Sequence, residues 1–261
     1  MPRNDWSKLK ARLARTDFRR GKLLVGLDFD GVLSEITPHP ADAALSPRTA
    51  QLLKALRGRS DTRLAIISGR GIGDLRRLVG LHGIFYSGNH GLQIRGPGLR
   101  WMHPEANEVD RAVWRGLEEG LKDIPGAIVE HKILGAAIHY RQVRPEHRRR
   151  LSGLVRAHHR SLSGRFRILP GKKIFDLRPA LAWDKGRALD MIRQRLEPRF
   201  AWNAVFVGDD KTDEEAFLTL AGTALTVRVG RVSRSAAQYV IPGRSWVDHL
   251  LEELVRRPGA S

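Results

Sequence analysis

Three short apolar runs recur along the chain, and each is followed at once by glycine or a polar residue. The runs are Leu23–Leu27 before Asp28, Leu64–Ile67 before Ser68, and Ala204–Val207 before Gly208 and Asp209. Uninterrupted apolar runs of this length are typical of strands that are buried on both faces of a parallel sheet. Leucine and isoleucine at helical spacing precede the second and third runs. This alternation predicts a doubly wound α/β fold, in which ligands bind beyond the carboxyl ends of the strands.

The pattern changes between Pro104 and Arg178. We expect a smaller α/β domain at 104–179, inserted into a Rossmann-like core formed by 1–103 and 180–261. Its expected elements are a helix from about Glu105 to Lys122, strands at Ala127–Val129 and Ile133–Tyr140, a helix after Pro145, and strands near Phe166–Leu169 and Lys173–Leu177. Before the core, Trp6, Leu9 and Leu13 predict an amphipathic helix that packs on the core or on a partner.

Two carboxylates follow the first apolar run, in Asp28-Phe29-Asp30-Gly31. At the end of a buried strand both can face a ligand once the chain turns at Gly31. Because a phosphate dianion repels carboxylates, such a site needs a hard divalent cation, and Mg²⁺ with oxygen ligands fits. Asp28 is then the nucleophile that forms an aspartyl phosphate, and Asp30 is the general acid and base. Taken alone, the motif also fits a helix cap or an Asx turn.

A second acidic motif, Gly208–Asp213, follows the third apolar run and favours the catalytic interpretation. We expect Asp209 to bind the metal with Asp28 and the backbone carbonyl of Asp30, and Asp213 to support the metal or to hold a lysine. Thr212 and Glu215 have the spacing of a capping box, so we assign Glu214 and Glu215 to the start of a helix.

Two weaker signals complete the set. The hydroxyl of Ser68 and the amides near Gly69 can bind phosphoryl oxygens, although Ser-Gly after a strand also occurs in ordinary turns. Lys185 opens a predicted helix and can place an ammonium near the charge that develops during phosphoryl transfer, although a lone lysine is usually solvated.

Composition excludes several other classes of protein. The chain has no cysteine, so disulfides and thiolate chemistry are ruled out. Its net charge of +18 attracts polyanions, but the basic residues are dispersed and no nucleic-acid-binding motif accompanies them. No run is long enough to span a membrane, and the arginine-rich N-terminal stretch lacks the apolar core of a secretory signal. We therefore expect a cytoplasmic monomer whose partner is a small molecule rather than nucleic acid or a membrane.

The order of these motifs resembles the haloacid dehalogenase superfamily of aspartate-nucleophile phosphatases and, more narrowly, the trehalose-6-phosphate phosphatase family. The narrower resemblance rests on Gly88–Gly91, Glu130–Lys132, His139–Arg141, Gly171–Pro179 and Asp184–Gly186. It implies a Rossmann-like core with a mobile cap, Mg²⁺, and conversion of trehalose 6-phosphate to trehalose and phosphate. It also implies that residues of the cap reach the sugar hydroxyls, namely Glu130, Lys132, Arg141 and Asp176. Arg70 and His90 are further candidates for contact with the substrate.

The chain departs from the family pattern at two positions. Val32 replaces a threonine, which removes one hydroxyl near the phosphate, and Asp176 replaces a glutamate, which shortens one sugar-binding acid by a methylene. Opposite charges on neighbouring strands also pair with each other, so Glu130, Lys132 and Arg141 have a structural alternative. Other open alternatives are a phosphatase for sucrose phosphate or a mannosyl phosphoglycerate, and a non-catalytic nucleic-acid-binding protein on the same fold.

Overall fold

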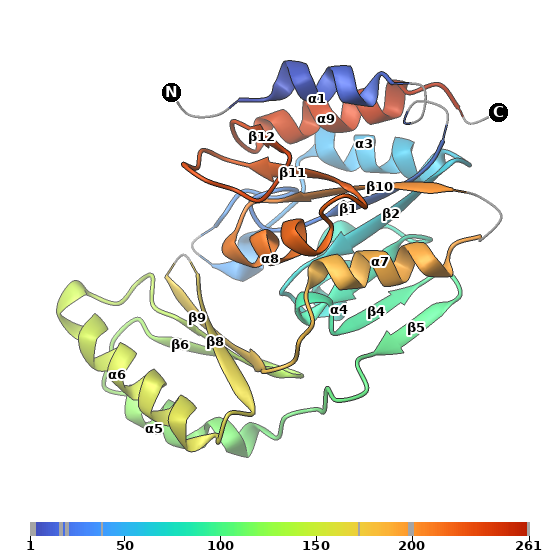
Figure 1. Ribbon diagram of the computed structural model, residues 1–261. Coiled ribbons are helices and arrows are strands. Elements are labelled where there is room, and N and C mark those ends of the chain that lie inside the picture. Colours follow the sequence, from blue (N-terminus) through green and yellow to red (C-terminus); the bar gives the residue numbers. More distant parts are fainter. Residues whose placement is uncertain are drawn as a thin grey trace. The chain divides into compact units, whose positions relative to one another are not determined.

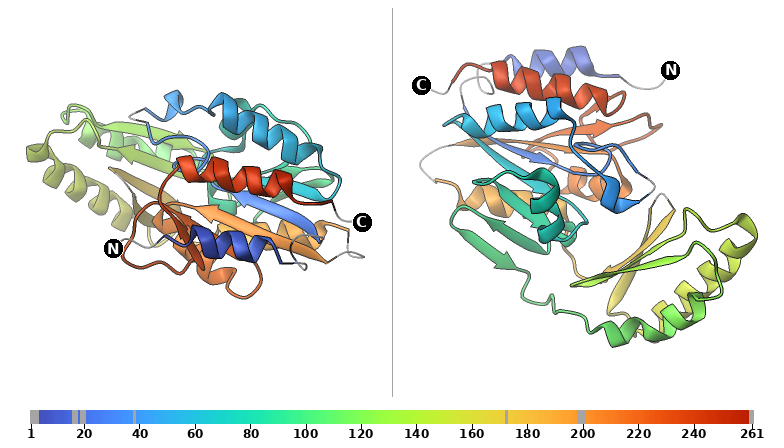
Figure 2. Two further views of the ribbon diagram at one scale, coloured as in Figure 1. Left: turned by 90° about the horizontal axis from the view of Figure 1, so that it is seen from above. Right: turned by 180° about the vertical axis from the view of Figure 1, so that it is seen from behind.

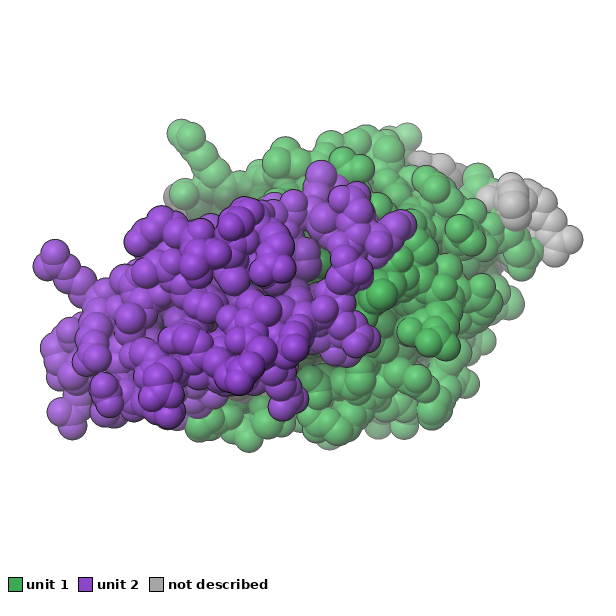
Figure 3. Space-filling model, turned by 90° about the horizontal axis from the view of Figure 1, so that it is seen from below, with its two compact units in different colours: residues 1–102, 183–261 green, residues 103–182 purple. Residues whose placement is uncertain are grey.

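The computed structural model describes residues 4–15, 18, 21–37, 39–171, 173–197 and 201–259 (Figure 1). These residues belong to two units (Figure 3). Unit 1 comprises Met1–Met102 and Trp183–Ser261, and unit 2 comprises His103–Ala182. Unit 1 is therefore assembled from two separate stretches of the chain, with unit 2 between them in the sequence.

An eight-stranded sheet with the order β12-β11-β10-β1-β2-β3-β4-β5 forms the centre of unit 1. The strands from β12 to β3 in this order run parallel. Strand β4 pairs antiparallel with both β3 and β5, so β5 again has the direction of the parallel strands. The strand bounds are β1 (Lys22–Leu27), β2 (Thr62–Ile67), β3 (Phe85–Gly88), β4 (Gln93–Gly96), β5 (Leu99–Met102), β10 (Trp202–Gly208), β11 (Leu225–Val229) and β12 (Tyr239–Ile241). The predicted α/β fold with a mostly parallel sheet is confirmed, and the three apolar runs are the neighbouring strands β10, β1 and β2.

Helices cover both faces of this sheet (Figure 2). One face carries α1 (Trp6–Leu13), α3 (Pro47–Gly58), α4 (Ile72–Val79) and α9 (Ser245–Arg256), and the other carries α7 (Lys185–Arg195) and α8 (Lys211–Thr219). Short 3₁₀ turns lie at η1 (Pro40–Asp42) and η2 (Asn89–Gly91). None of the helices within the described residues is long and apolar enough to cross a bilayer.

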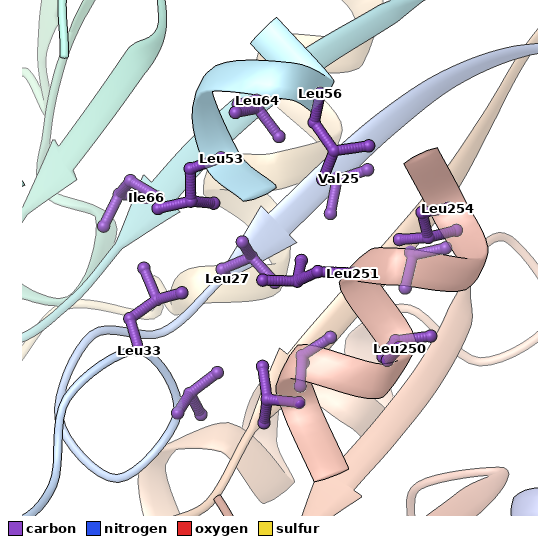
Figure 4. Close-up of a cluster of buried hydrophobic side chains, with 14 of the residues drawn as sticks. Val25, Leu27, Leu33, Leu53, Leu56, Leu64, Ile66, Leu250, Leu251 and Leu254 are labelled. Carbon is purple, nitrogen blue, oxygen red and sulfur yellow. The ribbon is translucent and has the colours of Figure 1, made fainter. Parts of the chain in front are cut away.

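Successive residues of β1 point to opposite faces and so supply both cores. Val25 and Leu27 pack with leucines of α3 and α9 in one buried cluster (Figure 4). Leu24 belongs to the other cluster, with side chains of α7 and α8. Because a strand alternates its side chains, a run that is apolar at every position has both faces covered.

The predicted N-terminal amphipathic helix is α1. Leu9 and Leu13 are buried in the same cluster as α9, and the ring of Trp6 lies 5.4 Å from that of Trp246 on α9. Of the two predicted alternatives, this helix packs on its own core.

Unit 2 contains a four-stranded antiparallel sheet with the order β6-β7-β9-β8. Its elements are η3 (Arg111–Trp114), α5 (Arg115–Leu121), β6 (Ile128–Lys132), β7 (Gly135–His139), α6 (Pro145–Ser161), β8 (Phe166–Gly171) and β9 (Ile174–Pro179). Side chains of α5 and α6 bury one face of the sheet through Trp114, Leu151, Val155 and their neighbours. The other face of the sheet carries the charged residues described below.

The predicted helix from Glu105 to Lys122 is wrong in its first half. Residues 103–110 are not helical, and a 3₁₀ turn at η3 precedes α5. The backbone N–H of Val109 donates to the carbonyl of Ile133 at 2.8 Å, which holds this stretch against the β6–β7 turn. The carboxylate of Asp110 then accepts a hydrogen bond from Ala112 N at 2.8 Å and starts the helical turn. A tertiary contact thus replaces the helical bonds that the pattern suggested.

Candidate active site

Three neighbouring strands of unit 1 deliver the predicted polar residues to one edge of the sheet. Strand β1 lies between β10 and β2, and all three are parallel. Asp28, Ser68 and Asp209 directly follow these strands. Because the carboxyl ends of parallel strands share an edge, residues distant in sequence meet there.

Lys185 bridges two of the predicted acids. Its Nζ donates to Asp28 Oδ2 and to Asp213 Oδ1, each at 2.8 Å. The exposed fractions of the three side chains are 3% for Lys185, 6% for Asp28 and 0% for Asp213. Lys185 is the first residue of α7, while Asp213 lies in the first turn of α8. The starts of two helices therefore place an ammonium between two buried carboxylates.

Burial is the largest influence on the ionisation of this group. Without a metal, burial raises the pKa of Asp28; the charge of Lys185 opposes this shift, and Asp213 and Asp209 add to it. Burial alone lowers the pKa of Lys185, but the attraction of Asp213 and Asp28 outweighs it and the pKa is raised above its usual value. Lys185 therefore stays an ammonium ion, and the site carries an excess of acidic groups.

The same acids form a group that suits a divalent cation. Asp28, Asp209 and Asp213 place carboxylate oxygens within 4.8 Å of one another. Three carboxylates against one ammonium leave negative charge that a hard cation with oxygen ligands, such as Mg²⁺, can neutralise. Asp213 already accepts hydrogen bonds from Lys185 Nζ and from the backbone N–H groups of Asp209 and Asp210, at 2.9 and 3.0 Å. Asp213 therefore holds the lysine, while Asp28 also accepts a hydrogen bond from Phe29 N at 2.7 Å.

The turn after β1 lies directly against Asp209. Gly31 adopts a φ of +79°, and a Cβ atom at this position would overlap the Asp209 carboxylate. Only glycine combines this left-handed backbone with so close an approach. Gly31 therefore allows the Asp209 carboxylate to approach the backbone of the turn that follows Asp28.

Asp30 lies outside the acid group and binds Arg70. The Arg70 guanidinium donates from Nε and Nη2 to the two Asp30 oxygens, each at 2.7 Å, and it covers the ring of Phe29 at 5.3 Å from the centroid. The Asp30 side chain is 40% exposed and that of Arg70 is 13% exposed. The Asp30 carboxylate is thus held in a fixed direction at the rim of the site. Its backbone carbonyl stays a predicted metal ligand.

The segments after β2 and β3 contain the remaining predicted residues of unit 1. Ser68 is buried, and its Oγ accepts a hydrogen bond from Arg70 N at 3.3 Å. The ring of His90 packs against Gly69, where a Cβ atom would lie 2.6 Å from it. Ser68, Arg70 and His90 therefore belong to one packed group.

The capping box predicted for Thr212 and Glu215 is wrong. Helix α8 begins at Lys211, its N-cap is Asp210, and the reciprocal acid of the box is Asp213. Asp213 takes this position in the capping box because its carboxylate also accepts a hydrogen bond from the buried Lys185. Glu214 instead binds Arg228 at 2.9 Å and the Ser235 hydroxyl at 2.9 Å, and so anchors the loop after β11.

The cap residues implied by the resemblance lie on the sheet of unit 2. Register places Glu130 and Asp176 on either side of Ala137, on the face opposite the helices. Lys132 Nζ donates to Asp176 Oδ1 at 2.7 Å, and His139 Nε2 lies 2.7 Å from Glu130 Oε2. These charged groups surround the small side chain of Ala137, a layout that can accept the hydroxyl groups of a sugar.

Other residues of unit 2 bear on this face. Arg141 lies beyond the end of β7 and is exposed. Register adds Arg167 and Arg178 to the face of Asp176. The sequence alone did not identify either arginine or the bond between His139 and Glu130. Alternate residues of β6 to β9 point to the same face of the sheet, and this pattern identifies the residues of that face once the strand register is known.

Comparison with known proteins shows the family of the chain. Residues 26–240 match the sequence profile of the trehalose-phosphatase family. The chain is 33% identical over 260 residues to the probable trehalose-phosphate phosphatase D of Arabidopsis thaliana, covering 90% of this chain and 68% of that protein. It is 37% identical over 216 residues to an uncharacterized glycosyl hydrolase of Mycobacterium tuberculosis, covering 78% of this chain but 16% of that much longer protein.

A solved structure shows the same fold. The C-terminal domain of the C. albicans trehalose-6-phosphate phosphatase matches with a TM-score of 0.80 and 21% identity, over 98% of each chain. At this identity the likeness concerns the fold, and the sequence matches carry the assignment to a family.

Proposed function

Because the chain belongs to the trehalose-phosphatase family, we propose that it hydrolyses trehalose 6-phosphate to trehalose and phosphate through a phosphorylated Asp28, with Mg²⁺ as cofactor. The observation that carries this proposal is the buried group in which Lys185 bridges Asp28 and Asp213 within reach of Asp209. A nucleophilic carboxylate needs nearby positive charge to accept a phosphate dianion, and this group combines an ammonium with oxygen ligands for a cation.

In the first half of the reaction, an oxygen of Asp28 attacks phosphorus as the bond from phosphorus to the sugar oxygen breaks. The Lys185 ammonium and the Ser68 hydroxyl bind phosphoryl oxygens, where negative charge must be stabilised. Asp30 gives its proton to the departing sugar oxygen. Asp28 and Asp209 would hold Mg²⁺, which would supply positive charge to offset the repulsion between the phosphate and these carboxylates.

In the second half, a water molecule attacks the phosphorus of the aspartyl phosphate through its oxygen, and Asp30 takes a proton from this water. The bond between phosphorus and Asp28 then breaks, which releases phosphate and restores the free carboxylate. The same residue serves as acid and then as base, so its carboxylate must point toward the ester throughout. The two hydrogen bonds from Arg70 supply that direction.

In this proposal unit 1 is the hydrolase core and unit 2 is the cap that binds the sugar. Glu130 and Asp176 accept hydrogen bonds from sugar hydroxyls, while Lys132 and Arg141 donate to sugar oxygens. The face of the unit 2 sheet that lies opposite α5 and α6 supports this assignment, since Glu130, Lys132 and Asp176 share it.

Phosphate release from a panel of esters tests the proposal. The panel contains trehalose 6-phosphate, sucrose 6-phosphate and a mannosyl phosphoglycerate, each with and without Mg²⁺. We expect trehalose 6-phosphate to have the highest kcat/KM and every ester to require the metal. Because Asp176 is shorter than the usual glutamate and already pairs with Lys132, preference for another sugar phosphate is the second candidate. Hydrolysis of no ester, together with salt-sensitive binding of DNA or RNA, would contradict both.

A further inference from the structure

The loop Gly88–Gly91 is fastened to the segment that holds Asp30. The backbone N–H of His90 donates to Ser68 O at 3.0 Å, and that of Asn89 donates to Arg70 O at 2.9 Å. Arg70 in turn holds the Asp30 carboxylate through two hydrogen bonds. The place of this loop therefore sets the place of the Arg70 backbone.

The two segments are in close contact. A Cβ atom at Gly88 would lie 2.8 Å from Arg70 O, and one at Gly69 would lie 2.6 Å from the His90 ring. The loop is also bent, since Asn89 and His90 have φ values of 51° and 57°. Such left-handed backbone is held by its surroundings.

On its other side, the same loop meets Trp183. The indole Nε1 of Trp183 donates to Gly91 O at 2.9 Å. A Cβ atom at Gly91 would lie 2.8 Å from Asp184 O and 3.1 Å from Trp183 Nε1. The Trp183 ring also packs on Trp101, with centroids 4.8 Å apart.

Trp183 stands where the chain returns to unit 1. It is the first residue after His103–Ala182, and Trp101 is next to the last residue before that stretch. Asp184 follows, and its carboxylate caps α7 through Gly186 N at 2.6 Å. The tryptophan thus lies between the linker from unit 2 and the helix that presents Lys185.

We propose that Trp183 is a positioning residue for Asp30, which it directs through Gly91, the Gly88–Gly91 loop and Arg70. The inference rests on the proposed function, in which Asp30 protonates the leaving sugar oxygen. It assigns a role to a motif that the phosphatase mechanism leaves unused. Loss of the Trp183 hydrogen bond lets the loop and Arg70 shift, so that proton transfer weakens while Asp28 still attacks.

The test compares two esters with different leaving groups in the full chain loaded with Mg²⁺. A sugar alkoxide is a strong base and needs the proton from Asp30, whereas 4-nitrophenolate is a weak base and leaves without it. Trp183→Phe keeps an aromatic ring on Trp101 and removes the N–H donor. We expect the single-turnover rate of trehalose release to fall about tenfold and that of 4-nitrophenolate release to stay within about twofold, because release of the leaving group reports only the half of the reaction in which Asp30 acts as an acid. An equal fall for both esters, or no fall for the sugar ester, would overturn the inference.

Three further variants sharpen the result. Trp246→Phe makes the same substitution in α9, where the ring packs on Trp6, and both activities should be unchanged. Trp101→Leu removes the ring under Trp183 and should give the same selective loss. In the Asp30→Asn background, Trp183→Phe should cause no additional loss with the sugar ester, because the two changes act on one step. A full additional tenfold loss would count against the inference.

The wild-type rates separate the inference from its premise. A wild-type chain that hydrolyses neither ester overturns the proposed function, and the inference with it. A wild-type chain that hydrolyses both esters, with a Trp183→Phe variant that loses both equally, overturns the inference alone.

Discussion

Lys185 Nζ lies 2.8 Å from Asp28 Oδ2, although 157 residues separate the two in the sequence. The contact joins the start of α7 to the end of β1, and the same nitrogen reaches Asp213 on α8. One ammonium therefore fixes the direction of the predicted nucleophile and compensates part of the charge around it. Removing the nucleophile or the metal should have separable consequences.

Replacing the nucleophile should abolish turnover and preserve the fold. In Asp28→Asn the side chain keeps its size and Lys185 keeps its bond to Asp213, so we expect a melting temperature close to that of the wild type. We expect kcat to fall by about a thousandfold or more, because an amide cannot form the phosphorylated intermediate. Asp190→Asn, on α7 and paired with Arg193, is the control and should keep its activity. Substantial turnover by Asp28→Asn would rule out the mechanism.

Metal removal should stop the reaction, and Asp209, which follows β10, should set the metal requirement. We expect chelation to abolish phosphate release and added Mg²⁺ to restore it. Asp209→Asn should raise the Mg²⁺ concentration for half-maximal rate by at least about tenfold. Asp210→Asn is a matched control, because Asp210 caps α8 and asparagine caps equally well. Equal metal titrations of the two variants would show that Asp209 is not a ligand.

Substitutions on the sheet of unit 2 should weaken binding of the sugar and leave hydrolysis of the phosphate ester bond unchanged. Glu130→Gln keeps the shape of the side chain and removes a charged acceptor, so we expect KM for trehalose 6-phosphate to rise about tenfold. The rate with 4-nitrophenyl phosphate should not change. Glu118→Gln is matched to it, because Glu118 pairs with His131 at 2.6 Å and lies on α5, on the covered side of the sheet. If both variants raise KM alike, Glu130 has no special contact with the sugar.

A half-buried histidine of α6, His158, predicts how stability depends on pH. Burial lowers the pKa of His158, against a backbone hydrogen bond with Val113, and its Nε2 has no hydrogen-bond partner within the described part of the chain. The unfolded chain then binds more protons than the native one below the ordinary histidine pKa of about 6.5, so the free energy of unfolding falls as pH falls through that value. The effect is absent at higher pH, where His158 is neutral in both states.

Urea denaturation at pH 5.5 and 7.5 checks this sign. His158→Gln should lose less stability between the two pH values than the wild type does. His147→Gln, on the same helix, should behave like the wild type. A wild-type midpoint that rises on acidification would be incompatible with this assignment.

The sequence was sufficient to predict those site residues that directly follow a buried strand. Asp28, Ser68 and Asp209 could be identified because each follows a buried strand, and parallel strands end at a common edge. The bond between Arg70 and Asp30 could not be predicted, since it depends on where two loops meet. The position of the capping box was predicted wrongly for the same reason. Both Thr212 with Glu215 and Asp210 with Asp213 fit the local pattern, and only the bond from the buried Lys185 to Asp213 distinguishes them.

Trp101 and Trp183 touch at the two points where the chain leaves unit 1 and returns to it. Because the two rings pack on each other, the chain leaves unit 1 and returns to it at neighbouring places, where closing the ends of an insert costs little entropy. We therefore expect that residues 103–182 can be exchanged for another insert without disturbing the acids of unit 1. If the insert binds the sugar, as proposed, such an exchange would change the alcohol specificity and leave the strands of the core unaltered.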